Sequence, residues 1–412
     1  MRILAGVPSV KPVHSSACPI AIWSLFFLVG AVLATPAAAQ VDPIIRNQIQ
    51  LGYDQPITGK GPQALYLYYY RNDPEFLRTN LTLRLAVAPA YMDSEIGIKD
   101  ILSSTTALGV GISGGTFGDN HYEVRQGHYL RGESFYGHGG GGSLSLYQRL
   151  NPRELVPVHL VLRGGFRYTT YDNNGNTEDD FELPAERMNY YLRTGLRVAG
   201  REPTLYPDLA MELSLWFERQ WRMESTEFGF NNDRQVNAAG NLYWVYSGFH
   251  YAWTNVGHKL DIDITAGGSD DADRFNAWRL GGVLPLVAEF PLVLPGYYYQ
   301  EISADSFVHV YGGYSISLDD QNRWRIRIEG AGARVRYLPG FEQNDPWNTG
   351  VGTGLLYTSR NKVLTVGVRY GYGFEALRHG EKGAHSVGVL LQYDFEAMKL
   401  KRAKQRNERP PL

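Results

Sequence analysis

The connections between the expected strands alternate in length along this chain, and this alternation limits the fold more than any other feature. Segments of alternating apolar and polar residues are joined by a short turn at one end and by a longer, more polar loop at the other. This sorting is typical of a transmembrane β-barrel, and a soluble sandwich has no reason to adopt it. The seven predicted turns are 72–75, 116–119, 151–154, 201–203, 254–257, 319–322 and 359–362.

The predicted fold is all-β, a transmembrane antiparallel β-barrel of about 16 strands, an even number that fits a single-chain barrel. With both termini periplasmic, the short turns are periplasmic, and the longer loops, notably 172–186 and 268–300, lie outside. The sixteen predicted strands begin near Arg46, Pro62, Leu77, Ser103, Asn120, Gly139, Leu155, Arg187, Pro207, Gln235, His258, Ile302, Arg323, Asn348, Val363 and Ala384.

The first forty residues predict a secretory signal. Arg2 and Lys11 are the only charges before the apolar run 20–30, and small residues follow, so cleavage is expected near Ala39. The alternative, a transmembrane anchor, needs a longer apolar run. We therefore expect a signal peptide over 1–39, an outer-membrane barrel over 40–395 and a basic tail over 396–412. No folded periplasmic module is expected before the first strand.

Composition argues against several classes of function. The single cysteine, Cys18, lies in the predicted signal, so the mature chain is expected to have no disulfide, thiolate metal site or cysteine nucleophile. A formal net charge of -2 gives no electrostatic case for nucleic acid as a partner. We expect outer-membrane lipid around the barrel, and neither a cofactor nor a metal.

Charged residues on one face of several segments indicate the lumen. Val368 and Tyr370 share a face, whereas Arg369 lies on the other, and a lone arginine facing lipid costs about 2–4 kcal/mol at the bilayer midplane. The charges either pair with one another and brace the wall, or they set ion selectivity or hold a plug segment. The predicted lumen charges are Arg163, Arg167, Arg193, Arg197, Glu212, Glu218, Arg325, Arg327 and Glu329.

The longest connection, 268–300, is too apolar to lie free in water. A sixteen-stranded barrel also encloses an aqueous channel unless something fills it. We therefore expect this loop to fold into the lumen as a hairpin, with its glycines allowing close approach to the wall. Its motif residues are Leu280, Gly281, Gly282, Pro295, Gly296 and Tyr297.

Leu280-Gly281-Gly282 and Gly296-Tyr297 resemble the sixth extracellular loop of the bacterial surface antigen barrels. These barrels belong to the superfamily of outer-membrane protein assembly factors and two-partner secretion translocators. Five predicted strands follow this loop and eleven precede it, as in that family's barrel. The resemblance implies a translocation or insertion barrel, with a separate periplasmic or secreted client protein as its partner.

The sequence departs from that family in two respects. The family's tip arginine, which pairs with an acidic residue on a following strand, is replaced here by Pro295. Glu329 is expected to stand in the acidic position without its partner, so the loop should be anchored more weakly. The family's periplasmic repeats are not expected either.

Two motifs associated with catalysis or nucleotide binding occur in the wrong context. Residues 109–114 satisfy G-x-G-x-x-G and residues 111–115 satisfy G-x-S-x-G, but both lie within a strand segment rather than between a strand and a helix. We therefore expect no enzyme. Asp270, Asp271 and Asp273 lie close together, yet their spacing matches no established calcium loop, which favours a solvated loop.

Two functions besides translocation or insertion are compatible with these features. One is a passive outer-membrane channel for small solutes, and the other is a structural surface barrel with a plugged lumen. Loop 268–300 distinguishes them from a translocator, because a translocator-like barrel requires that loop to enter the lumen.

Overall fold

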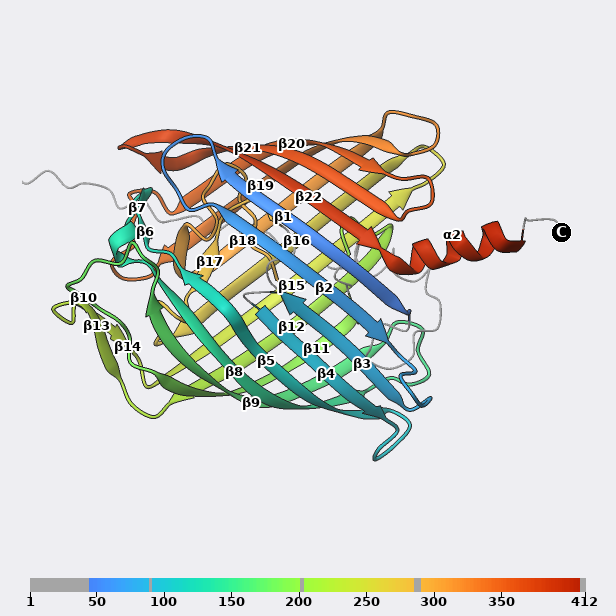
Figure 1. Cartoon of the computed structure of the whole chain (residues 1–412), viewed down its shortest axis with the longest axis horizontal. Coiled ribbons are helices and arrows are strands. Elements are labelled where there is room, and N and C mark those ends of the chain that lie inside the picture. The colour runs from blue at the N-terminus through green and yellow to red at the C-terminus, as the bar shows by residue number, and fades with distance from the viewer. Residues whose placement is uncertain (1–43, 89–90, 201–203, 285–289, 408–412) are drawn as a thin grey trace, which may run out of the picture.

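The computed structural model describes residues 44–88, 91–200, 204–284 and 290–407, and within them sixteen wall strands close into an antiparallel barrel (Figure 1). Each strand pairs with its neighbours along the chain, and pairing of the first strand with the last closes the sheet. The predicted fold class is confirmed. The wall strands are β1 (Arg46–Pro56), β2 (Ala64–Asp73), β3 (Leu81–Ala88), β4 (Tyr91–Lys99), β5 (Thr106–His121), β8 (Phe135–Arg149), β9 (Val158–Asn173), β11 (Arg187–Gly200), β12 (Leu209–Arg222), β15 (Ala239–Trp253), β16 (His258–Asp270), β18 (Ile302–Ser317), β19 (Trp324–Tyr337), β20 (Trp347–Thr358), β21 (Leu364–Arg378) and β22 (Glu381–Asp394).

The predicted strand number is right because two errors cancel. One strand was expected from Leu77, but this part of the chain forms both β3 and β4. The strand expected near Asn120 does not exist, because β5 continues to His121. Residues 116–119 are therefore no turn, and the seventh short turn lies between β4 and β5. The residues predicted as a turn instead coincide with a register shift in the β5–β8 ladder, between Gly115 and Asp119.

The two ends of the barrel differ. One, which we call the turn end, carries the connections that follow β2, β4, β8, β11, β15, β18 and β20, and α2 (Phe395–Asn407) extends from it (Figure 1). The predicted basic tail thus begins as a helix. The opposite loop end carries most of the longer connections. These contain β6 (Val124–Arg125), β7 (His128–Tyr129), η1 (Arg131–Glu133), β10 (Phe181–Glu182), β13 (Thr226–Phe230), β14 (Arg234–Val236) and β17 (Trp278–Leu280).

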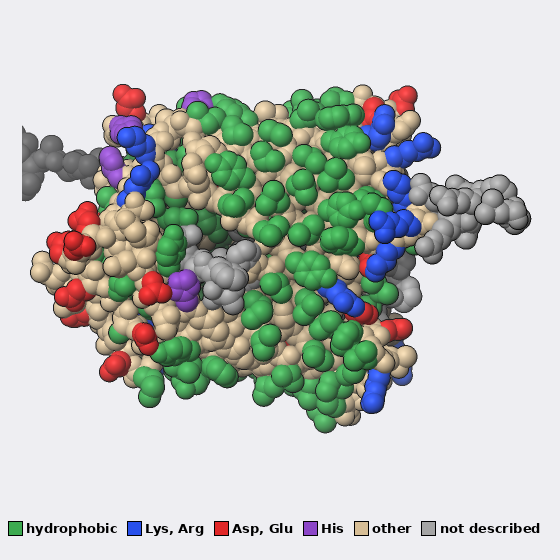
Figure 2. Space-filling model, viewed as in Figure 1, with side chains coloured by type: hydrophobic (Ala, Val, Ile, Leu, Met, Phe, Trp, Pro, Cys, Tyr) green, Lys and Arg blue, Asp and Glu red, His purple; other side chains and the backbone are tan. Residues whose placement is uncertain are grey.

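Side chains on the wall alternate between two environments. In β21, Val368 and Tyr370 are 49% and 40% exposed, whereas Arg369 between them is 1% exposed. Figure 2 shows hydrophobic side chains spread over the face of the wall in view, with Lys and Arg side chains gathered at the end from which α2 extends. No helix among the described residues is long and apolar enough to cross a bilayer. The predicted signal peptide lies outside the described residues.

Candidate functional site: a lumen filled from both ends

The connection between β16 and β18 turns back into the barrel as a hairpin. It spans 271–301, because β16 continues to Asp270. Its β17 pairs with the start of β18, and beyond it the Gly281 amide donates to Leu292 O at 3.0 Å and the Leu294 amide donates to Gly282 O at 3.1 Å. Leu280 and Leu294 have no exposed surface. We call residues 280–301 the lumen loop.

The lumen loop touches walls on nearly opposite sides of the barrel. The Val283 amide donates to Asp54 Oδ2 of β1 at 2.9 Å. The ring of Phe290 lies 5.8 Å from that of Trp244 and 5.2 Å from that of Tyr246, both on β15. Eight wall strands lie between β1 and β15 in one direction around the sheet and six in the other. The loop therefore crosses the lumen rather than lining one side.

The tip of the lumen loop lies directly on a glycine-lined part of the wall. A Cβ atom on Gly350 would lie 2.2 Å from Pro295 O, and one on Gly371 would lie 2.7 Å from the Gly296 amide nitrogen. Gly296 has φ +86°, which disfavours any other residue, and its own Cβ would lie 1.9 Å from Gly373 N. The wall is thus shaped to receive the backbone of the loop.

Glu329 does have an arginine partner, contrary to the expectation from the sequence. The arginine is Arg369 of β21, whose guanidinium pairs with Glu329 Oε1 and also donates to Val283 O of the lumen loop. Both members of the ion pair are about 1% exposed. The wall supplies an arginine for Glu329, so Pro295 at the tip does not leave the carboxylate unpaired.

Two glycines let this pair form across an intervening strand. β20 lies between β19 and β21, and Gly352 stands opposite Glu329 while Gly354 stands opposite Arg369. A Cβ atom on Gly352 would lie 2.9 Å from Glu329 Oε1, and one on Gly354 would lie 3.2 Å from Arg369 Cγ. A side chain at Gly352 would therefore occupy the space that the buried carboxylate uses.

The buried network continues from Glu329 along β19. Arg327 Nε lies 3.1 Å from Glu329 Oε2, and Arg327 Nη1 lies 2.5 Å from Asp261 Oδ2 of β16. The Tyr311 hydroxyl donates to Glu329 Oε2 at 2.7 Å. Since a buried charge is tolerated only when it is paired and hydrogen-bonded, these contacts allow four charged groups to lie together in the lumen.

A second buried arginine holds the base of the lumen loop. Arg378 of β21 binds both oxygens of the Glu301 carboxylate, at 2.7 and 2.9 Å. Its guanidinium carbon lies 3.4 Å from the centroid of the Tyr298 ring. Bidentate geometry and a stacked ring fix an arginine more tightly than a single contact does.

The remaining predicted lumen charges lie in β9, β11, β12 and β19. Arg167 of β9 is exposed, and Arg325, near the turn end of β19, is half-buried. The others pair with carboxylates: Arg163 with Asp93 at 2.5 Å, Arg193 with Glu218 at 2.6 Å, and Arg197 with Glu212 at 2.7 Å.

The connection between β11 and β12, predicted only as a short turn, enters the lumen from the turn end. Residues 201–203, the predicted turn, lie outside the described residues. After them, the Leu205 amide donates to Gln392 Oε1 at 3.0 Å, and Lys259 Nζ donates to Tyr206 O at 3.0 Å. Leu205 and Tyr206 share a hydrophobic cluster with Leu284 of the lumen loop. We call residues 204–208 the turn-end plug, and it meets the lumen loop inside the barrel.

Charged and aromatic contacts join the loops at the loop end. Arg125 Nε lies 2.7 Å from Glu123 Oε1, and Arg274 of the β16–β18 connection lies 3.3 Å from the same oxygen. Burial by itself would raise the pKa of Glu123, but Arg274 and Arg125 lower it. Beside this network, Phe135, Phe181 and Phe228 form a buried cluster. The loop-end connections therefore pack into a folded cap.

Asp273 braces the same connection. Its carboxylate lies 2.5 Å from Arg222 Nη1 and accepts a hydrogen bond from the Asn237 amide at 3.0 Å. Among the described residues, no group of three or more His, Cys, Asp or Glu side chains is placed to hold a metal ion.

These features define a class of protein: a closed sixteen-stranded barrel of the outer-membrane type, whose lumen is occupied by the loop that precedes its last five strands. No protein-family model matches the sequence, and no curated protein matches it. Solved structures do share the fold. The resemblance to surface-antigen-type barrels is confirmed at that level.

The solved structures with a similar fold include two CdiB proteins and a BamA protein. CdiB from Acinetobacter baumannii has a TM-score of 0.56 at 10% identity, over 88% of this chain and 65% of that chain. CdiB from Escherichia coli has a TM-score of 0.53 at 14% identity, over 88% and 67%. BamA from Haemophilus ducreyi lacking POTRA domains 1-3 has a TM-score of 0.50 at 10% identity, over 91% and 78%. The chain thus spans about two thirds of the length of each CdiB protein.

Proposed function

We propose that this protein is an outer-membrane translocation or insertion barrel, held closed at rest by the lumen loop and the turn-end plug. Its loop end faces the outside and its turn end the periplasm. The partner is a separate periplasmic or secreted client protein, and the barrel acts without chemical catalysis. The observation that carries the proposal is a loop that crosses the lumen and is held by two wall arginines, Arg369 and Arg378.

The loop's anchors suit a segment that moves as a unit. Its tip lies on wall glycines, and its polar contacts with the wall are few, at Val283 and Glu301, rather than a continuous strand ladder. The rest of its attachment is apolar packing, in which Leu292, Leu294 and Tyr297 share a buried cluster with wall residues. The fold shared with CdiB and BamA supports the same interpretation.

The competing function is a permanently plugged structural barrel, which the extent of buried ion pairing favours. A disulfide lock that fixes the lumen loop to the wall distinguishes these two functions experimentally. A Cβ atom on Gly388 would lie 3.7 Å from Val283 Cβ, a separation typical of disulfides, and Cys18 is the chain's only cysteine. The pair V283C/G388C should therefore fix the lumen loop to β22.

The measurement is single-channel conductance of the refolded full chain in planar bilayers. Wild type should show a mostly closed state with brief openings, which the oxidised lock abolishes and reduction restores. The single variant V283C is the control. If wild type and both the oxidised and the reduced V283C/G388C variant show no openings, the structural barrel is favoured.

A deletion tests the occupancy of the lumen separately. Removing residues 283–294 should produce a large, stable pore, because a barrel of this size encloses an aqueous channel once it is emptied. Removing the exposed residues 178–180 of another loop-end connection is the control. A wide, steady conductance already present in wild type would support a passive channel instead.

A further inference from the structure

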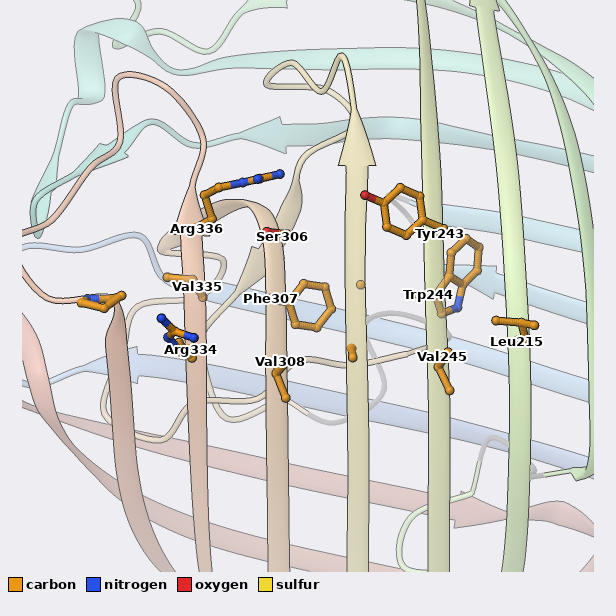
Figure 3. Close-up of a pocket in the computed structure, with 13 residues that line it drawn as sticks. Leu215, Tyr243, Trp244, Val245, Ser306, Phe307, Val308, Arg334, Val335 and Arg336 are labelled. Atoms are coloured by element: carbon orange, nitrogen blue, oxygen red, sulfur yellow. The ribbon is translucent and has the colours of Figure 1, made fainter. Parts of the chain in front are cut away.

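A hollow of about 600 Å³ opens on the outer wall near the loop end (Figure 3). It arises where the β16–β18 ladder stops, at Gly267 opposite Phe307, after which β18 pairs with β17 instead. Two small residues of β16, Ala266 and Gly267, are among its lining. Figure 3 shows the rings of Tyr243 and Phe307 turned toward β16 from either side. We call it the lateral hollow.

The lateral hollow belongs to the lipid-facing side of the wall. Its lining includes Leu215, Tyr243, Val245 and Val308, whose exposed fractions are 53%, 43%, 38% and 52%. They belong to the outward set of their strands, because buried residues such as Trp216 and Trp244 alternate with them. The lining also includes Trp244, Phe307 and Val335, which are buried, so the hollow extends from the lipid-facing surface inward between the strands.

Two arginines of β19 stand at the edge of the hollow and also face outward. Arg334 and Arg336 are exposed, whereas Ala333 and Val335 beside them are buried. Arg336 lies 2.6 Å from Asp305 and keeps 66% of its side chain exposed. Arg334 takes part in no ion pair within the described part of the chain. An unpaired arginine on the lipid-facing side is unfavourable unless an anion or the membrane interface satisfies it.

The depth of Arg334 matches the headgroup region. It stands opposite Trp347 in the β19–β20 ladder, and Trp347 is 52% exposed on the outer wall near the loop end. Exposed tryptophans at strand ends mark the interface between acyl chains and headgroups. The guanidinium groups therefore lie at the level of lipid phosphates, with the apolar hollow beside them.

We propose that the lateral hollow binds a phosphorylated acyl lipid of the outer leaflet, the lipid A part of lipopolysaccharide. An acyl chain fills the hollow over Ala266, and a phosphate binds Arg334 and Arg336. Charge-assisted contacts of arginine to phosphate are strong and geometrically specific. The choice of lipid rests on the proposed orientation, in which the loop end faces outside.

The test measures binding of diphosphorylated lipid A to the full chain in detergent by native mass spectrometry. Dephosphorylated lipid A with the same acyl chains and inorganic phosphate serve as comparison probes. Wild type should retain diphosphorylated lipid A and bind the dephosphorylated form at least about tenfold more weakly. Inorganic phosphate should not displace the bound lipid. Equal binding of both lipids, or competition by phosphate alone, would overturn the proposal.

Three variants locate the site. R334Q/R336Q should lose about tenfold in affinity, and A266F, which fills the hollow but keeps both arginines, should also weaken binding. R78Q/R360Q removes the same charge from exposed positions at the turn end and should bind like wild type.

Each variant is first checked for a folded barrel by its heat-dependent gel mobility. If R334Q/R336Q and R78Q/R360Q bind equally, the site is not here. Because the intact loop is kept, this result is independent of whether the barrel conducts.

Discussion

Arg369 and Glu329 meet over Gly352, a residue of the strand that separates them, and Arg369 also binds the backbone of the lumen loop at Val283. One wall arginine therefore performs two tasks: it neutralises a buried carboxylate and it holds the loop. In a barrel whose loop carried the arginine, withdrawing the loop would strip the carboxylate of its partner. Here the ion pair stays in the wall when the loop leaves, so opening does not remove the partner of Glu329.

Replacing Arg369 by Met should destabilise the barrel strongly. Removal of one partner leaves Glu329 buried beside Arg327 alone, and breaking such a pair costs about 3–5 kcal/mol. The free energy of unfolding, from urea titration in detergent, measures the loss. The double variant R369M/E329Q should recover much of it. If R369M alone is as stable as wild type, the pair contributes nothing to folding.

Gly296→Ala should displace the loop tip without disturbing the wall. A Cβ at this position would lie 1.9 Å from Gly373 N, and φ +86° is strained for alanine. We expect more frequent openings in single-channel recordings. Gly312→Ala is the matched control, because a Cβ there meets nothing within 4 Å. Equal opening rates in the two variants would contradict the close fit of the tip.

The turn-end plug should loosen in acid. Burial by itself would raise the pKa of Asp208, but Lys259 and Lys362 lower it to about 2. Because this folded-state pKa lies below the ordinary value of about 3.9, the contribution of Asp208 to stability is present above about pH 4 and is lost as the pH falls toward 2.

Asp208→Asn tests this linkage. The variant should be less stable than wild type at pH 7, and the difference should shrink between pH 4 and pH 2. Asp320→Asn, on the exposed turn between β18 and β19, is the control. A stability difference that is as large at pH 2 as at pH 7 would exclude the ion pair as its source.

Cysteine labelling tests the orientation. A cysteine at Asn176, exposed at the loop end, should react with a membrane-impermeant maleimide on intact cells, whereas one at Asp320, exposed at the turn end, should react only after lysis. Labelling of the cysteine at Asp320 but not of the one at Asn176 on intact cells would contradict the proposed orientation, and with it the proposed function.

The sequence predicts the barrel well because its signals are local. The alternation of a strand has a period of two, and a short turn can be recognised from a few consecutive residues. Six of the seven predicted turns accordingly lie in turn-end connections. The failures around 81–121 have the same origin. Residues 116–119 resemble a turn when read locally, yet β5 continues through them and pairs with β8 both before and after them.

The interior is less predictable because it depends on register across several strands. The alternation of residues predicts that Arg369 and Glu329 both face the lumen. Their pairing additionally requires that β20 present glycines at the two positions between them. The turn-end plug is even harder to predict from nearby residues. Leu205 and Tyr206 resemble ordinary turn residues in the sequence, and only the folded barrel shows that they pack against Leu284.

The shared cluster of Leu205, Tyr206 and Leu284 makes the two halves of the closure interdependent. Withdrawal of the lumen loop exposes apolar surface on the turn-end plug, and withdrawal of the plug does the same to the loop. Thermodynamic linkage makes such an influence equal in both directions. A partner that binds only at the turn end would therefore change how readily the lumen loop is released. A ligand at the loop end would, by the same amount, change the protein's affinity for that partner.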